Sequence, residues 1–134
     1  MNSLKLFKGS CHCKAVKFEV LASDEVTVWV CNCSVCQMRK NYHFIVPRSQ
    51  MKEIIGADQL TTYTFGTHTA KHMFCRVCGI SPFYIPRSNP DGYAITLDCL
   101  ELDCRPAKIH MKMYDGRNWE RSFEETGIKS ETKG

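Results

Sequence analysis

The residues of this sequence best suited to chemistry are its cysteines. The sequence has 134 residues, and nine of them are cysteine. Seven of them fall into three short clusters, Cys11-His12-Cys13, Cys31-Asn32-Cys33-Ser34-Val35-Cys36 and Cys75-Arg76-Val77-Cys78. Cysteine thiolates bind zinc, and a C-x-x-C turn followed by a glycine is typical of a zinc knuckle. The three clusters therefore predict metal sites rather than isolated thiols.

The third cluster supplies two ligands, whereas a structural zinc site needs four. Cys11 and Cys13 can be the second pair, because alternate residues of an extended segment place their side chains on the same side. We therefore predict a structural zinc held by Cys11, Cys13, Cys75 and Cys78. Spacing alone also allows another arrangement, in which the middle cluster takes one cysteine from elsewhere in the chain.

The middle cluster differs from the other two, because Cys31, Cys33 and Cys36 can converge on one metal with no fourth ligand nearby in the sequence. Three protein ligands and one open position are the arrangement of a catalytic zinc, since water or substrate takes the open position. Two other interpretations stay open. Cys99, His43 or His72 closes the site and makes it structural, or the three thiols carry no metal and serve redox chemistry.

Cysteine usage also indicates a reducing compartment. The count of nine is odd, which a closed set of disulfides does not give. Residues 1–6 lack the apolar core and the cleavage site of a signal peptide. No run approaches the roughly 20 apolar residues that cross a bilayer. We expect a cytoplasmic protein without a membrane partner, and entry into the nucleus stays open.

The formal charge of +4 is a weak indication of nucleic-acid binding, because thiolates that ligate zinc offset most of it. Four cationic residues lie close in the sequence to the predicted ligands: Arg39, Lys40, Arg76 and Arg87. They either balance the thiolate charge or form a cationic rim for a ligand that carries carboxylates.

The elements that must position these clusters are mostly strands. Apolar residues recur at every second position, or form β-branched and aromatic runs between turn residues. These patterns predict strands at Val16 to Val20, Val26 to Val30, Tyr42 to Val46, Leu60 to Phe65, Pro82 to Ile85, Tyr93 to Leu97 and Ile109 to Met113. With 134 residues and no low-complexity linker, the chain is expected to form one domain.

Helical patterns are weak. We predict one or two helical turns at Ser49 to Ile55, stopped by Gly56, and a short helix at Trp119 to Glu125. The residues after Gly127 are polar, and we expect them to be frayed. The predicted fold class is therefore all-β with short helices.

The ordered motifs G-S-C-x-C, C-x-C-x-x-C and F-x-C-x-x-C-G resemble those of the glutathione-dependent formaldehyde-activating enzyme family. The runs Tyr63 to Thr67, Ser81 to Ser88 and Asp115 to Glu120 are most similar to its animal, centromere protein V-like branch. The resemblance covers residues 7–123 and leaves residues 124–134 as a polar tail. The branch's best-known member carries a long basic segment before its domain, which this sequence lacks.

The resemblance implies a zinc-stapled Mss4-like β-tent with two zinc ions per chain. The structural zinc would bind Cys11, Cys13, Cys75 and Cys78. The second zinc, the catalytic one, would bind Cys31, Cys33 and Cys36. The implied reaction is the condensation of glutathione with formaldehyde to S-hydroxymethylglutathione, a carbon–sulfur lyase chemistry.

Fold alone does not establish that activity, so alternatives stay open. The first is a non-enzymatic zinc module that carries glutathione or docks a protein partner. The second is methionine-sulfoxide reduction on a similar fold, which needs a reactive cysteine outside both metal groups. Cys99 and Cys104 are the two cysteines left for that role.

Overall fold

The computed structural model describes residues 3–132 of the chain. The strands are β1 (Leu4–Ser10), β2 (Lys17–Ser23), β3 (Glu25–Cys31), β4 (His43–Pro47), β5 (Met51–Ile55), β6 (Leu60–Tyr63), β7 (His72–Cys75), β8 (Phe83–Tyr84), β9 (Gly92–Thr96) and β10 (Lys108–Tyr114). The helices are α1 (Ser34–Arg39) and α2 (Trp119–Thr126), with short 3-10 turns η1 (Arg48–Gln50), η2 (Ala57–Gln59), η3 (Leu97–Cys99), η4 (Gly116–Asn118) and η5 (Ile128–Thr132).

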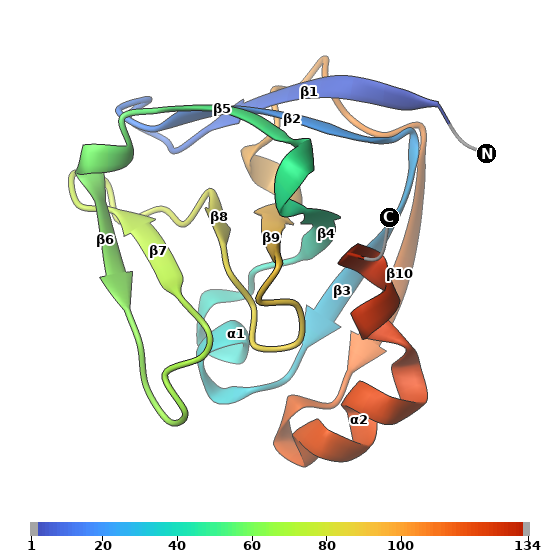
Figure 1. Ribbon diagram of the computed structural model, residues 1–134. Helices are drawn as coiled ribbons and strands as arrows, with labels where there is room; N and C mark the ends of the chain where they lie inside the picture. Colours follow the sequence, from blue (N-terminus) through green and yellow to red (C-terminus); the bar gives the residue numbers. More distant parts are fainter. Residues whose placement is uncertain (1–2, 133–134) are drawn as a thin grey trace.

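The strands form three sheets, arranged around the centre of the molecule in Figure 1. The largest has the order β10-β3-β4-β9-β8, with β10 parallel to β3 and the other pairs antiparallel. A three-stranded sheet, β1-β2-β5, runs across the top of the view, and the hairpin β6-β7 lies at its left side. The expected all-β fold with few short helices is confirmed.

The five-stranded sheet is covered on both faces, because neighbouring residues of its strands point in opposite directions. Val28, Phe44, Phe83 and Ile95 pack on the face toward β1 and β2, where Cys11 and Cys75 also lie. The residues beside them in the sequence, Trp29, Ile45, Tyr84 and Ala94, pack on the opposite face together with Cys36. One sheet thus separates two apolar cores, and each core contains cysteines.

The helix predicted at Ser49 to Ile55 is wrong. A single 3-10 turn, η1, is followed directly by β5, which pairs antiparallel with β2. Pairing with β2 satisfies the backbone of β5 and packs Ile54 against the main core, so tertiary contacts override the weak helical preference. Gly56 does end the segment, with φ 81°.

The end of the chain is also more ordered than expected. Instead of fraying after Gly127, residues 128–132 form η5, and Ile128 is 3% exposed within the second core. The buried Asn89 amide donates to the Ile128 and Lys129 carbonyls and to Thr132 Oγ1. The signal for this segment lies in Asn89, about 40 residues away, and local polarity does not reveal it.

The boundary between a domain at 7–123 and a tail at 124–134 stays a prediction. None of the helices within residues 3–132 has the length and apolar character that would let it cross a membrane.

Candidate metal centres and their cavity

The sulfur atoms of Cys11, Cys13, Cys75 and Cys78 all lie within 4.8 Å of one another. Cys13 Sγ is 3.7 Å from Cys11 Sγ and 3.6 Å from Cys75 Sγ. Four convergent sulfurs suit tetrahedral coordination of a soft metal. This cluster could therefore hold a metal ion, with residues near the start of the chain joined to a turn more than 60 residues later.

Two turns position these thiols. In the knuckle, the Gly79 and Val77 amides donate to the Cys75 carbonyl and to Cys75 Sγ, and Gly79 has φ 80°. The Cys11 arm is a turn rather than the extended segment we predicted. Its Cys11 amide donates to the Val16 carbonyl, and Lys14 adopts a left-handed φ of 65°. The turn brings the two sulfurs together as an extended arm was expected to do.

The second cluster contains Cys31, Cys33 and Cys36, whose sulfurs also lie within 4.8 Å of one another. Cys31 ends β3, Cys33 caps α1 at its N-terminus, and Cys36 lies within the first turns of that helix. The Cys33 amide donates to Cys31 Sγ at 3.4 Å. A strand that ends directly before a helix therefore folds three thiols around one point, which could hold a metal ion.

The three thiols influence one another's protonation. Hydrogen bonds from the Cys31 and Cys36 thiols lower the pKa of Cys33 to about 2. The same contacts with Cys31 and Cys33, together with burial, raise the pKa of Cys36. The cluster thus favours a thiolate at Cys33, and thiolates are the form in which cysteine ligates metals.

No fourth donor from the described part of the chain completes this cluster. Among residues 3–132, no His, Cys, Asp or Glu ligand atom joins the group within 4.8 Å of all three sulfurs. Cys99 instead lies near the four-cysteine cluster, where it lines the same cavity as Cys11. Burial raises the pKa of Cys99 to about 12, which keeps the thiol protonated near pH 7. His43 and His72 line the cavity at the three-cysteine cluster without joining it.

His43 belongs to a buried chain of polar contacts that leads to Cys36. Its Nδ1 lies 3.1 Å from Asn41 Oδ1, and its Nε2 lies 3.3 Å from the Tyr84 hydroxyl. That hydroxyl is 3.7 Å from Cys36 Sγ. Burial lowers the pKa of His43 to about 4, so the imidazole is neutral near pH 7.

A cavity of about 530 Å³ opens above the three cysteines. The rings of Phe65, His72 and Tyr84 form a stacked wall, with centroid separations of 5.4 and 5.1 Å. Arg87 and Arg117 line the cavity as well. Its volume is within the range of small-molecule sites, which combine apolar walls with a few polar groups.

One of the four residues of the predicted cationic rim lines this cavity. Of the four cations named from the sequence, Arg87 lines it, whereas Arg39 and Lys40 line the separate cavity of about 940 Å³ beside the four-cysteine cluster. Arg76 bonds to Gln59. Arg117 was not recognised as a member of the rim. The sequence feature that could have indicated Arg117 is its position in the run Asp115 to Glu120. Its hydrogen-bond partner Gln37 lies 80 residues away, so local spacing does not connect the two.

Comparison with known proteins places residues 6–117 within the family model described as glutathione-dependent formaldehyde-activating enzyme. A crystal structure of a Rhodobacter sphaeroides protein is similar to this fold, with a TM-score of 0.65 and 37% sequence identity. The similarity covers 78% of this chain and 99% of that chain. The family match includes every cysteine of both clusters.

Proposed function

This chain belongs to the family of glutathione-dependent formaldehyde-activating enzymes, and from that premise we propose that it is a zinc-dependent enzyme of the carbon–sulfur lyase type. Its substrate is a glutathione adduct such as S-hydroxymethylglutathione, formed or cleaved in the cavity above Cys31, Cys33 and Cys36. The cytoplasm supplies the reducing conditions that keep these thiols free of disulfides.

Zinc fits the chemistry of both clusters. Cys11, Cys13, Cys75 and Cys78 supply the four sulfurs of a structural zinc site, and the three-cysteine cluster supplies three with one position open. When bound at the open cluster, zinc supplies positive charge that lowers the pKa of an incoming thiol.

The reaction requires a proton to leave the thiol and later to reach oxygen. In the forward direction a sulfur–carbon bond forms, the carbonyl π electrons move to oxygen, and the resulting alkoxide takes up one proton. The reverse direction breaks the carbon–sulfur bond and returns formaldehyde and thiol. No oxidant or reductant takes part, so the cavity has only to bind the thiol and favour its ionisation.

The protein's own residues set the environment of that step. Asn41 Oδ1 accepts from His43 Nδ1–H, so Nε2 accepts the proton of the Tyr84 hydroxyl. This arrangement places the Tyr84 hydroxyl 3.7 Å from Cys36 Sγ, and burial keeps the imidazole neutral. The stacked rings of Phe65, His72 and Tyr84 cover one side of the cavity and limit the access of water to the reacting sulfur.

The observation that carries this proposal is the set of three convergent cysteines at an open cavity, with no fourth donor among residues 3–132. The test is Cys33→Ser, assayed by two-dimensional exchange NMR of the hemithioacetal formed from glutathione and ¹³C-formaldehyde. We expect the wild type to accelerate exchange and Cys33→Ser to reduce it to the uncatalysed rate, with zinc content falling from two to one.

Cys104→Ser is the matched control, because Cys104 belongs to neither cluster, and its exchange rate and zinc content should equal those of the wild type. If Cys33→Ser loses zinc but leaves the exchange rate unchanged, the enzyme proposal is wrong. A variant that also loses glutathione binding would then point to a non-enzymatic glutathione carrier.

A further inference from the structure

We infer that Arg87 and Arg117 form a two-sided clamp for the two ends of the substrate, and we call this pair the arginine clamp. The clamp selects thiols that carry a carboxylate at each end over small neutral thiols. It assigns the γ-glutamyl end of glutathione to Arg87 with Glu120, and the glycyl carboxylate to Arg117. This inference rests on the proposed function, because it names how that same site recognises its substrate.

Arg117 is fixed beside the three-cysteine cluster. Its Nε donates to the Asn32 carbonyl at 3.3 Å, and its Nη2 donates to Gln37 Oε1 at 2.8 Å. Asn32 lies between two of the cysteines, and Gly116, the residue before Arg117, packs directly against Cys31 and Cys33. These contacts leave guanidinium donors free, and both partners are neutral, so within residues 3–132 the charge of Arg117 has no ion-pair partner.

Arg87, which follows β8 in the chain, lines the same cavity. Its guanidinium carbon lies 3.7 Å from the centre of the Trp119 ring, and its Nη2 is 3.3 Å from Glu120 Oε1. Stacking on the indole holds the guanidinium in one place, while the Glu120 side chain is 81% exposed and holds it weakly. A ligand carboxylate can therefore bind Arg87 through its remaining donors.

The pairing of Arg87 with Glu120 matches one end of glutathione in particular. The γ-glutamyl residue carries an ammonium and a carboxylate on the same carbon, and the structure presents a cation and an anion side by side. The carboxylate would bind Arg87 and the ammonium Glu120. The glycyl end carries a carboxylate alone, which matches Arg117 and its neutral partners.

The acidic side chain next to the cavity is Glu120, which pairs with Arg87 but does not line the cavity itself. Among the described residues that line it, none is Asp or Glu, and Arg87 and Arg117 are its Arg or Lys side chains. Both arginines therefore face a space whose fixed negative charge lies at the cysteines. A thiol with flanking carboxylates places each of its charges opposite a partner of the other sign.

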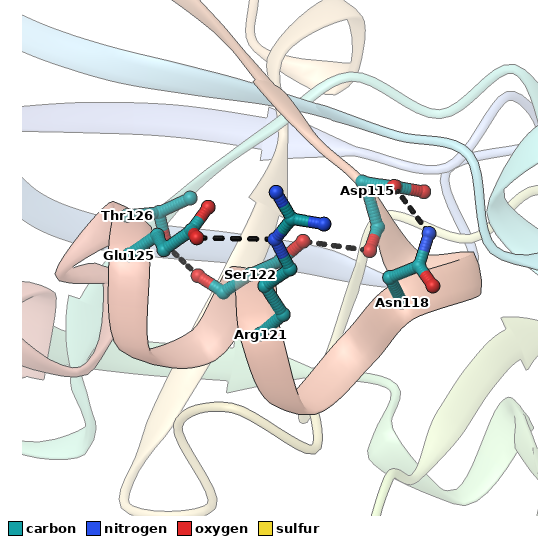
Figure 2. A network of polar contacts seen from close by, with 6 residues as sticks. All are labelled: Asp115, Asn118, Arg121, Ser122, Glu125 and Thr126. Atoms are coloured by element: carbon teal, nitrogen blue, oxygen red, sulfur yellow. Dashed lines mark hydrogen bonds and ion pairs between the residues drawn. The ribbon is translucent and has the colours of Figure 1, made fainter.

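Hydrogen bonds join the start of the turn η4 to helix α2, as Figure 2 shows. The Ser122 hydroxyl donates to the Asp115 carbonyl at 2.7 Å, and Asn118 Nδ2 donates to Asp115 Oδ2 at 2.8 Å. These bonds tie α2, which carries Trp119 and Glu120, to the turn that carries Arg117. They hold Trp119, on which Arg87 stacks, next to the turn that carries Arg117.

The test is a ¹H–¹⁵N NMR titration of the zinc-loaded protein with S-methylglutathione, whose thioether cannot add to an aldehyde. Arg117→Ala and Arg87→Ala should each weaken binding by about 10-fold. Esterifying the glycyl carboxylate should weaken wild-type binding to a similar extent and remove the penalty of Arg117→Ala. Removing the γ-glutamyl residue from the ligand should likewise remove the penalty of Arg87→Ala.

Two features of the chain sharpen this experiment. The sequence has two tryptophans, so the indole N–H signal of Trp119 reports on Arg87 and can be told from that of Trp29. We expect the Trp119 signal to shift with S-methylglutathione and to stay in place with the ligand that lacks the γ-glutamyl residue. Arg121→Ala is the matched control, because Arg121 bonds to Glu125 on α2, does not line the cavity, and should leave binding unchanged.

The arms of the experiment separate two kinds of failure. If the wild type does not bind S-methylglutathione, or binds the glycyl ester equally well, the clamp is overturned without reference to any variant. Equal penalties for all ligands in Arg117→Ala would overturn it as well. The remaining outcome is that the variants lose binding only to the ligands that keep the matching carboxylate, while the wild type does not accelerate hemithioacetal exchange. That result would support the clamp and contradict the proposed enzymatic function.

Discussion

His43 is a titratable side chain held where its charged form is disfavoured. It is 3% exposed, and the groups that face it are Asn41, the Tyr84 hydroxyl and, farther away, the charge of Cys33. Burial lowers its pKa from 6.5 to about 4, more than the nearby negative charge raises it. The unfolded chain therefore binds a proton at His43 at a pH at which the native protein does not.

This difference predicts acid sensitivity. The contribution of His43 to stability is present above pH 6.5 and is lost as the pH falls from 6.5 to about 4, for a total of about 3 kcal/mol. His43→Gln does not titrate, so between pH 7 and pH 5 it should lose about 2 kcal/mol less unfolding free energy than the wild type. Urea unfolding at the two pH values measures this.

The comparison with a variant is needed because acid also protonates cysteine thiolates in both proteins, and with them any metal site that those thiolates form. Met113→Gln is the control, since Met113 is exposed on β10 and carries no titratable group. It should keep the wild-type dependence on pH. Equal dependence in His43→Gln and the wild type would contradict the prediction.

Single residues also show what the sequence can reveal of the site. Cys31, Cys33 and Cys36 are recognisable because their spacing lets one turn of chain bring them together. Tyr84 and Arg117 are not, because their partners Cys36 and Gln37 lie 48 and 80 positions away. A tyrosine in a β run and an arginine after a turn look ordinary until the topology places them at the cavity.

At the scale of the element, the turn η4 determines the shape of the three-cysteine cluster. A Cβ atom on Gly116 would lie 2.6 Å from Cys33 Cβ and 2.8 Å from Cys31 Sγ. Its φ is not in the left-handed region, so space rather than backbone strain requires glycine there. The turn thus packs against Cys31 and Cys33 and fixes their separation.

We therefore predict that Gly116→Ala displaces Cys31 or Cys33 and weakens zinc binding at the three-cysteine cluster by about 10- to 100-fold, as loss of supporting residues around metal ligands does. Competition with a chromophoric chelator should show one zinc removed early and one retained. Gly127→Ala is the control, because a Cβ there meets no atom within 4 Å and Gly127 does not line the cavity, so its φ of 69° adds backbone strain without contact to the cysteines. Equal retention of both zinc ions in Gly116→Ala would contradict this role.

Other elements show where sequence patterns succeed and where they do not. The alternation in β3 predicts a strand because it reflects one buried and one more open side. Residues 108–113 of β10 alternate in the same way although all of them are exposed, and their strand forms at the edge of the sheet beside β3. Residues 51–55 carry no such pattern, and their strand exists because β2 offers an unpaired edge. The C-terminal turn η5 is ordered because Ile128 fills the second core. Such elements depend on partners far away in the chain, which local patterns do not contain.

At the scale of the whole molecule, the five-stranded sheet places the two cysteine clusters on opposite faces. Cys11 and Cys75 belong to the main core with Phe18 and Val28, whereas Cys36 belongs to the smaller core with Trp29 and Tyr84. The four-cysteine cluster joins the end of β1 to the end of β7, which no sheet connects. The three-cysteine cluster lies within one short segment and joins no distant parts of the chain.

This asymmetry predicts different consequences for the loss of one ligand at each cluster. Structural zinc binding contributes on the order of 10 kcal/mol in small domains, which is comparable to the whole stability of a domain this size. Cys75→Ser should therefore leave the chain largely unfolded at 25 °C. Cys36→Ser should keep the fold and one zinc ion, with a loss of about 1 to 3 kcal/mol from the altered core.

Circular dichroism melts combined with native mass spectrometry measure both quantities on the same samples. Both cysteines are buried, with Cys75 0% and Cys36 6% exposed, so each Cys→Ser change places the same hydroxyl in an apolar setting. A difference in melting temperature between the two variants then reflects which parts of the chain each cluster joins, because the burial of the two cysteines is similar. If Cys75→Ser melts within a few degrees of the wild type, the four-cysteine cluster does not hold β1 to β7. In that case the sheets alone must carry the fold.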